Sequence, residues 1–172
     1  MKFTELGKQD EKHLPIYGPG PFFGGTVIGV TLAVFLMRNA PLFAFGRRNG
    51  GGYILLMILG ALCVMAGIAL WIYAVPISKI DDGILHNYLV TTGAYALVRN
   101  PIYSAIMIAC TGVLLIAGNI CFLPLPFVYW IYMTVLLKNT EEKWLRNLYG
   151  QVYDDYCKSV NRCWPWIPKR HK

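Results

Sequence analysis

The sequence predicts an all-α, polytopic membrane protein with about four transmembrane helices. Of its 172 residues, 56% are hydrophobic and only 15% are charged, and the mean hydropathy is +0.45. An ordinary soluble domain carries about 25% charged residues. Each of the four apolar runs is near the roughly 17 to 25 residues that a spanning helix needs. These runs, which contain no Asp, Glu, Lys, Arg or His, are residues 22–37, 53–77, 101–117 and 120–137.

The N-terminal half is expected to hold a lead-in and two spans. Residues 1–21 mix charges of both signs and do not follow the layout of a signal peptide, so we expect them to remain as a lead-in. The run 22–37 would reach only about 24 Å as a helix, which makes it the weakest of the four spans. The run 53–77 carries Gly60 and Gly67, small residues that let helices approach closely in lipid, and Pro76 marks its end.

The third and fourth spans are expected to form a helical hairpin, residues 101–138. Asn100-Pro101 predicts the start of the third span, because Asn is a favoured N-cap and Pro a favoured first helical residue. Gly118-Asn119 predicts the turn. No Gly or Pro occurs between Phe127 and Tyr149, which predicts one helix that continues past the membrane near Lys138.

The C-terminal segment is expected to be amphipathic. Gly150 predicts a helix break, and residues 151–160 predict a second short helix with Val152, Tyr153 and Tyr156 on one face. The whole chain, residues 1–172, is then a single membrane domain. Its parts are a lead-in (1–21), two N-terminal spans (22–77) and a core with a capping C-terminal segment (78–172).

The distribution of charge predicts the orientation of the spans. The net charge is +7, and thirteen of the sixteen Lys and Arg residues lie in the N-terminal segment, the loop 78–100 and the C-terminal tail. The positive-inside rule therefore places both termini and this loop in the cytosol. Nucleic acid is a poor partner, because the basic residues flank the spans and form no recognisable binding motif. The bilayer is the expected partner.

Metal and disulfide chemistry are not expected. The five cysteines show no Cys-x-x-Cys spacing and are expected to be reduced thiols. Asp81 and Asp82 have no further carboxylate or His at ligand spacing, so we expect no metal site. His86, a lone histidine in the loop before the third span, stays open as a site residue.

Two distant stretches are predicted to meet. Counting outward from the Gly118-Asn119 turn, Asn100 and Lys138 return to the same membrane depth. Glu141 and Glu142 then lie about 4 to 6 Å further along the helix axis, toward the cytosol, and within side-chain reach of Arg99. Consecutive helical residues point about 100° apart, so one glutamate can hold Arg99 while the other accepts from a cationic ligand. A zwitterionic ligand would suit both charges. A pair of solvated surface carboxylates is the simpler alternative.

Several short motifs give this chain a resemblance to a known family. The motifs are Leu89-Val-Thr-Thr-Gly-Ala-Tyr, Val98-Arg-Asn-Pro-Ile-Tyr, Glu141-Glu142 with the tyrosines after it, and Asn161-Arg-Cys-Trp-Pro. In this order and spacing they resemble the isoprenylcysteine carboxyl methyltransferase and phospholipid methyltransferase superfamily of integral membrane enzymes. The resemblance covers about residues 80–168, and residues 1–75 match only as generic spans.

The resemblance implies a cofactor, S-adenosylmethionine, and residues that bind it. Arg162, with Tyr156 and Tyr153 nearby, would place the methyl acceptor, and Asn100 stands at a position that is both catalytic and cofactor-binding in the family. The cofactor-binding positions would be Val90, Gly93, Tyr95, Arg99, Asn100, Tyr103, Glu141 and Glu142.

The chain departs from the family pattern at two positions. Ala94 replaces the Pro of the usual Gly-Pro-Tyr, and Asn100 replaces the His of the usual Arg-His-Pro. Asn can form hydrogen bonds but cannot act as an acid or base near pH 7. The implied reaction is an in-line methyl transfer to a lipophilic, membrane-resident acceptor at the cytosolic face, and the loss of the His favours a carboxylate or thiol acceptor over an amine.

Two alternative functions stay open. Sterol reductases look distantly similar in the C-terminal region, so a small membrane reductase with a nicotinamide cofactor is one. A non-enzymatic lipid-binding membrane protein is the other.

Overall fold

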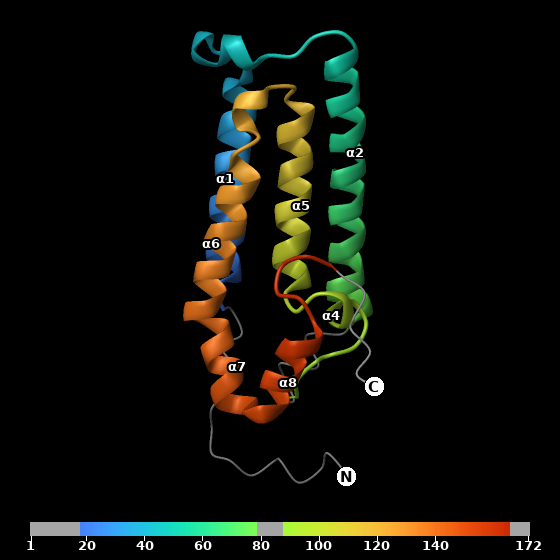
Figure 1. The fold of residues 1–172 in the computed structure, drawn as a ribbon, viewed down its shortest axis with the longest axis vertical. Helices are drawn as coiled ribbons and strands as arrows, with labels where there is room; N and C mark the ends of the chain where they lie inside the picture. The colour runs from blue at the N-terminus through green and yellow to red at the C-terminus, as the bar shows by residue number, and fades with distance from the viewer. Residues whose placement is uncertain (1–17, 79–87, 166–172) are drawn as a thin grey trace.

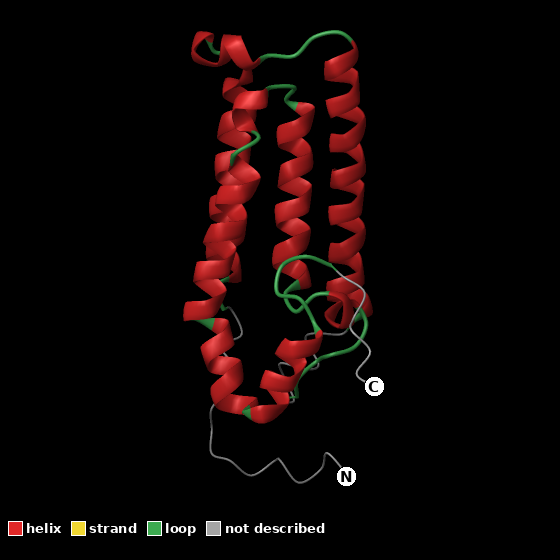
Figure 2. Cartoon of the chain, in the orientation of Figure 1, coloured by secondary structure: helices red, strands yellow, loops and turns green. Residues whose placement is uncertain are grey.

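The computed structural model describes residues 18–78 and 88–165, which form an elongated bundle of helices (Figure 1). No strand occurs among these residues (Figure 2), and one isolated bridge joins Arg47 to Asn119. The predicted all-α fold is therefore confirmed for the described residues. Most of the predicted lead-in, the loop with Asp81, Asp82 and His86, and the last seven residues lie outside them.

Four long helices run along the bundle axis, and shorter ones gather at its lower end in Figure 1. The long helices are α1 (Gly20–Leu36), α2 (Gly51–Ile72), α5 (Pro101–Ile116) and α6 (Leu125–Asn139). The short ones are α4 (Ala94–Leu97), α7 (Glu141–Tyr149) and α8 (Gln151–Ser159). A 3₁₀ turn, Met37–Asn39, extends α1, and a π-helical turn, Tyr73–Ile77, extends α2 around Pro76.

Three helices in the described part of the chain are long and apolar enough to cross a membrane. They are Gly20–Asn39, Gly51–Ile77 and the stretch Ile120–Tyr149. The last of these joins a 3₁₀ turn, the apolar α6 and the charged α7, so α6 is its membrane-spanning part. The first is longer than the sequence predicts, because the 3₁₀ turn continues it to Asn39. The predicted third span is α5, a shorter apolar helix of 16 residues, about 24 Å long.

Helix α5 is the centre of the bundle, with α2 on one side and α1 and α6 on the other (Figure 1). Gly60 of α2 and Gly112 of α5 face each other closely: a Cβ on either residue would lie within 2.6 Å of the other residue's carbonyl oxygen. Gly67 meets Ala105 and Ala109 in the same way. As predicted, small residues let these two helices pack backbone against backbone, which is a common way for helices to associate in lipid.

The α2–α5 contact gives a first prediction. Replacing Gly60 with Val is expected to lower the free energy of unfolding by about 1 to 3 kcal/mol, because the new side chain overpacks against α5. Gly25→Val is the matched control, since no described atom lies within 4 Å of the Cβ position at Gly25. Thermal unfolding in detergent measures both changes. Equal melting temperatures for the two variants would contradict the predicted close approach.

The predicted continuous helix from Phe127 to Tyr149 is wrong. The helix is interrupted at Thr140, whose backbone leaves the helical region at φ −122° and ψ −93°. The hydroxyl of Thr140 donates to the carbonyl oxygen of Leu136 at 2.7 Å. The two residues that follow are each tied to a partner outside the helix, Glu141 to Tyr103 and Glu142 to Arg162. The break separates the apolar α6 from α7, which carries Glu141 and Glu142.

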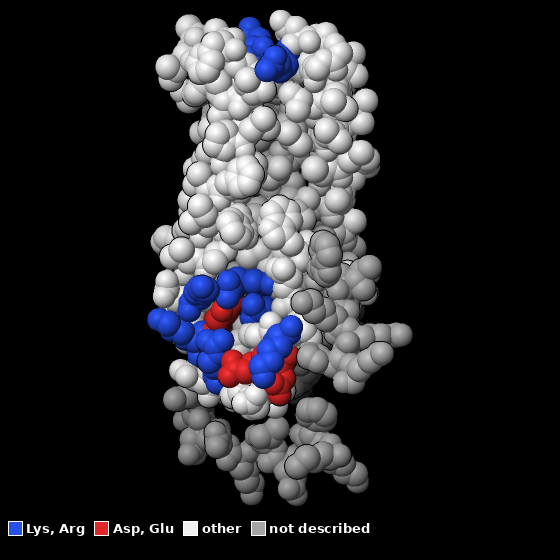
Figure 3. Space-filling model, in the orientation of Figure 1, with Lys and Arg blue, Asp and Glu red and all other residues white. Residues whose placement is uncertain are grey.

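On the face shown in Figure 3, charged side chains gather at the two ends of the bundle and leave its middle uncharged. The described residues at the upper end include Arg38, Arg47 and Arg48. The lower end carries a mixed cluster of both signs over α7, α8 and the segments beside them. This lower end is where the predicted site residues come together.

Candidate active site at the lower end of the bundle

The segment that follows α8 lies against the start of α5. The backbone N–H of Arg99 donates to the carbonyl oxygen of Asn161 at 2.8 Å. The side-chain amide of Asn100 donates to the carbonyl oxygen of Arg162 at 3.1 Å. The hydroxyl of Ser104 donates to the carbonyl oxygen of Cys163 at 2.6 Å. Three successive contacts therefore fix residues 161–163 beside residues 99–104.

Asn100 does not have the local role that the sequence predicts. It precedes Pro101, the first residue of α5, as expected, but its side chain makes no capping hydrogen bond to the helix. The side chain instead holds the chain after α8, through the Arg162 carbonyl. Asn100 therefore links the start of α5 to the segment that follows α8.

Glu142 is the centre of a buried ionic cluster. Its carboxylate accepts hydrogen bonds from Nε of Arg162 and, at 3.0 Å, from Nη2 of Arg162. Nη1 of Arg99 lies 3.5 Å from Oε1 of the same carboxylate. The side chains of Arg99 and Glu142 are only 8% and 4% exposed, and that of Arg162 is 22% exposed. The prediction that one of the two glutamates meets Arg99 is confirmed, and that glutamate is Glu142.

The cluster carries an excess of positive charge. It contains two guanidinium groups and one carboxylate, and Nε of Arg99 is buried without a hydrogen-bond partner among the described residues. A buried donor without a partner costs about 1 to 3 kcal/mol. A buried cationic group with an unused N–H is suited to a ligand carboxylate, which accepts charge-assisted hydrogen bonds from Arg.

Glu141 points to a different part of the bundle. Its Oε1 accepts a hydrogen bond from the hydroxyl of Tyr103 on α5, and a Cβ at Gly18 would lie 2.8 Å from it. Burial raises the pKa of the Glu141 carboxyl above its ordinary value, and the negative charge of Glu142 adds to this, while the hydrogen bond from Tyr103 works against it. As predicted, the two adjacent glutamates serve different partners.

The raised pKa of Glu141 predicts a pH-dependent stability. A carboxyl with a raised folded-state pKa destabilises the fold once it ionises, so this cost appears as the pH rises above the unfolded-state pKa. Glu141→Gln removes the charge and keeps an oxygen for the Tyr103 hydroxyl. We expect the variant to melt at a higher temperature than the wild type at pH 8, with a smaller difference at pH 5. Melting curves at the two pH values test this, and a constant difference would contradict it.

Helix α8 is held against α4 by its tyrosines. The hydroxyl of Tyr156 donates to the carbonyl oxygen of Tyr95 at 2.5 Å, and Tyr153 and Val160 are buried beside it. Burial raises the pKa of Tyr156, which keeps the hydroxyl protonated as a donor. The predicted burial of Tyr153 and Tyr156 is confirmed. The prediction for Val152 is wrong, because its side chain faces outward and is 48% exposed.

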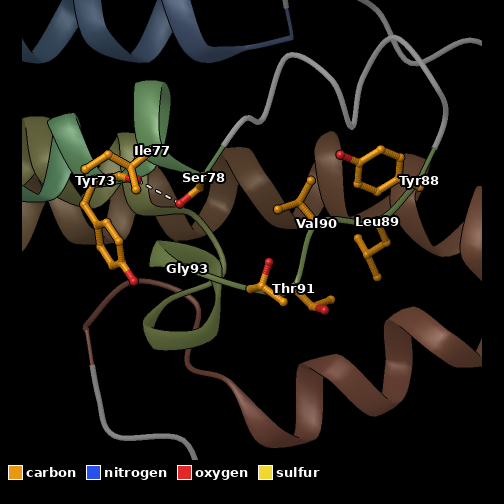
Figure 4. Close-up of a pocket in the computed structure, with 9 residues that line it drawn as sticks. Tyr73, Ile77, Ser78, Tyr88, Leu89, Val90, Thr91 and Gly93 are labelled. Carbon is orange, nitrogen blue, oxygen red and sulfur yellow. Dashed lines mark hydrogen bonds between the residues drawn. The ribbon is translucent and has the colours of Figure 1, made fainter.

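A pocket of about 450 Å³ opens beside the end of α2 (Figure 4). Tyr73 and Tyr88 stand on opposite sides of it, and Leu89 also packs against the buried tyrosines of α8. The hydroxyl of Ser78 closes one wall: it accepts from the N–H of Ala94 at 3.1 Å and donates to the carbonyl oxygen of Tyr73 at 2.8 Å. The lining residues are Tyr73, Ile77, Ser78 and residues 88–93.

The structure therefore distributes the predicted residues over three neighbouring places. Val90 and Gly93 line the pocket, and Arg99, Glu142 and Arg162 form the ionic cluster with Asn100 and Tyr156 beside it. Tyr103 and Glu141 form a separate pair. Three residues at these places are not predicted by the sequence: Tyr73, which lies in the π-helical turn, Ser78, which directly follows it, and Cys157, which contacts Arg99. Pro76 in an apolar run was the one available sign of the turn.

Comparison with known families shows which family the chain belongs to. The sequence model of the phospholipid methyltransferase family matches residues 52–152, which run from the start of α2 into α8. The chain belongs to the phospholipid methyltransferase family. The match includes α2, which the sequence analysis attributes only to a generic span, and it ends before Arg162.

A curated relative supports the same superfamily. The protein-S-isoprenylcysteine O-methyltransferase of Schizosaccharomyces pombe is 36% identical over 83 residues, which are 48% of this chain and 35% of the relative. The match spans about a third of the relative's length. No solved structure matches the chain. The resemblance noted from the sequence motifs is thus confirmed at the level of the superfamily.

Proposed function

We propose that this protein transfers a methyl group from S-adenosylmethionine to a lipophilic acceptor that reaches the lower end of the bundle from the membrane. The observation that carries the proposal is the buried cluster of Arg99, Glu142 and Arg162. Stretches 43 and 20 residues apart in the chain meet there, in a chain that belongs to a methyltransferase family.

The charges of the site fit the amino-acid part of the cofactor. Its carboxylate would bind to Arg99, whose Nε is buried and unpartnered among the described residues. Glu142 accepts two hydrogen bonds from Arg162 and also faces Arg99, so its charge is already shared by two guanidinium groups. Glu141, which faces no cation among the described residues and accepts one hydrogen bond from Tyr103, is the carboxylate that we assign to the ammonium group. A carboxylate offers about four lone-pair sites, so Glu141 can accept from the ligand as well as from Tyr103.

The neighbouring pocket fits the nucleoside part. Its volume lies in the range of small-molecule sites, roughly 300 to 1,000 Å³. Aromatic rings of Tyr73 and Tyr88 are available for the adenine, and the hydroxyls of Thr91 and Thr92 for the ribose. Val90 and Gly93, which the family resemblance assigns to the cofactor, belong to this pocket.

The contribution of the chain to catalysis is orientation. S-adenosylmethionine would supply an electrophilic methyl group, and well-oriented reactants can recover about 7 to 11 kcal/mol of barrier. Asn100 cannot take a proton near pH 7, and its amide is engaged with the Arg162 carbonyl. An acceptor that is already anionic, a carboxylate or thiolate, needs no base.

The names of the relatives support a lipophilic acceptor, and one of the two names an oxygen nucleophile. The family is named for phospholipids, and the Schizosaccharomyces pombe protein is named for O-methylation of S-isoprenylcysteine. Both names point to acceptors with long apolar chains. Among possible acceptors, we therefore favour an oxygen or sulfur nucleophile that is attached to a long apolar chain.

The membrane face of the active site is a separate proposal. We propose that the active site and both termini lie on the cytosolic face, because the distribution of Lys and Arg predicts this orientation.

Ligand titration tests the proposal. Purified protein in detergent is titrated with S-adenosylhomocysteine and, separately, with NADPH, and binding heats are recorded. We expect binding of the first ligand only, lost in Arg99→Ala and retained in Arg47→Ala, which removes an exposed arginine from the upper end. Binding of NADPH alone would favour the reductase alternative. If folded wild-type protein binds neither, the proposal is wrong.

Transfer itself is tested in cells. Cells that express the wild type or Arg99→Ala receive methyl-labelled methionine, and their lipid extracts are compared. We expect a labelled apolar product that only the wild type forms. Release of the label by mild base would identify a methyl ester, and a base-stable product would identify a thioether or an amine.

A further inference from the structure

Arg99 has a hydrogen-bond partner that no sequence motif indicates. Its Nη1 donates to the sulfur of Cys157 on α8, 58 residues further along the chain. We infer that Cys157 is a positioning residue that orients the Arg99 guanidinium toward its ligand. The inference rests on the proposed function, because the ligand is the carboxylate assigned there to Arg99.

Glu142 cannot by itself orient Arg99. Both of its oxygens accept hydrogen bonds from Arg162. Nη1 of Arg99 lies 3.5 Å from Oε1 of Glu142, which is longer than the roughly 2.7 to 3.2 Å of a direct N–H to O hydrogen bond. The attraction of the Glu142 carboxylate at this distance stabilises the charge of Arg99, but it does little to fix the orientation of the guanidinium plane. Among the described residues, the hydrogen bond that gives the guanidinium a direction is the one to Cys157.

The position of Cys157 is fixed by its neighbours on α8. Tyr156 is tied to the carbonyl oxygen of Tyr95, and Tyr153 and Val160 are buried in the small core that Leu89 and Cys157 also contact. At the other end, the backbone of Arg99 is tied to Asn161. The sulfur and the Arg99 backbone are therefore both anchored, and the hydrogen bond between them sets the plane of the guanidinium.

The consequence for Arg99 follows from the shape of its guanidinium. The group is planar, with five N–H donors in fixed directions. Once Nη1 is fixed on Cys157 and faces Glu142, the direction of Nε is fixed too. Nε is the atom that is buried without a partner among the described residues. Cys157 thus aligns the donor that we assign to the ligand carboxylate without touching the ligand itself.

Substitution of the thiol tests the inference. Cys157→Ala removes the acceptor, and Cys157→Ser restores a shorter one. We measure the dissociation constant of S-adenosylhomocysteine by calorimetry, with melting temperatures alongside. We expect Cys157→Ala to bind on the order of tenfold more weakly, as for loss of one hydrogen bond to a charged group, and Cys157→Ser to recover most of the affinity. Cys63→Ala, which alters a partly exposed thiol on α2, is the matched control and should bind like the wild type.

Thiol modification supplies a second measurement on the unaltered chain. Methyl methanethiosulfonate converts the Cys157 thiol into a methyl disulfide and releases methanesulfinic acid, and peptide mass spectrometry confirms the adduct. The added group blocks the hydrogen bond and adds bulk beside Arg99. We expect treated wild type to lose affinity for S-adenosylhomocysteine, and treated Cys157→Ser, which keeps the other four thiols, to keep it.

The outcomes separate this inference from the proposed function. Weaker binding in Cys157→Ala, recovery in Cys157→Ser and resistance of the serine variant to the reagent would support it. Equal binding by wild type, Ala and Ser variants would overturn the positioning role and leave the proposed function intact. Absence of binding to folded wild type would overturn both.

Discussion

Replacing Glu142 with Ala is expected to cause the largest loss of stability and of ligand binding in this protein. The substitution leaves two arginines, Arg99 and Arg162, without their shared carboxylate in a site where Glu142 is 4% exposed. Removing one partner from a buried ion pair costs about 3 to 5 kcal/mol, because the remaining charge stays buried and uncompensated. Chemical denaturation in detergent and titration with S-adenosylhomocysteine measure the two losses.

Asp154→Ala is the matched control for Glu142→Ala. Asp154 also pairs with an arginine, Arg146, at 2.7 Å, but the two side chains are 39% and 50% exposed. An exposed pair contributes only about 0 to 1 kcal/mol. If Asp154→Ala destabilised the protein as much as Glu142→Ala, burial of the Glu142 cluster would not be what matters. A double substitution, Glu142→Ala with Arg162→Ala, should lose less than the sum of the two single changes, since it leaves only one uncompensated charge.

Replacing Gly93 with Ala is expected to impair the pocket, with a loss of affinity for S-adenosylhomocysteine of about tenfold or more. Gly93 has a φ of +63°, which an L side chain rarely adopts, and a Cβ there would lie 2.5 Å from the Ser78 hydroxyl oxygen. The wall that Ser78 holds between Tyr73 and Ala94 must therefore move. Overpacking of this wall is expected to cost about 1 to 3 kcal/mol. A loss of about 1.4 kcal/mol of binding free energy raises the dissociation constant tenfold.

Gly50→Ala separates backbone strain from this steric effect. Gly50 has nearly the same φ, +61°, but no described atom lies within 4 Å of its Cβ position. Both variants should lose stability to backbone strain, of order 1 kcal/mol, and only Gly93→Ala should lose affinity. Equal affinities for the two variants, measured by calorimetry, would show that the pocket is not part of the ligand site.

The arrangement of the long helices follows from local signals in the sequence. Apolar run lengths, the Asn100-Pro101 start and the Gly118-Asn119 turn place the hairpin of α5 and α6, and counting residues from that turn brings Arg99 to Glu142. These signals suffice because helix rise is constant and a tight turn equalises depth. The family motifs then select most of the residues that gather at the lower end.

Other features depend on partners that lie far away in the chain. Asn is a favoured N-cap residue, yet the side-chain amide of Asn100 donates to the carbonyl oxygen of Arg162, 62 residues later. Arg99 donates to the sulfur of Cys157, 58 residues later. The break at Thr140 occurs without Gly or Pro, so no local signal announces it. Such choices are decided by tertiary contacts, which a periodic pattern does not encode.

The short helix α7 contacts two parts of the bundle through two adjacent residues. Glu141 leans on Tyr103 and Gly18 near the start of α1, and Glu142, the next residue, holds Arg99 and Arg162 beside α4 and α8. The non-helical backbone at Thr140 gives α7 a direction of its own, separate from that of α6. Two consecutive residues of one short helix thus connect the chain before α1 with the ionic cluster.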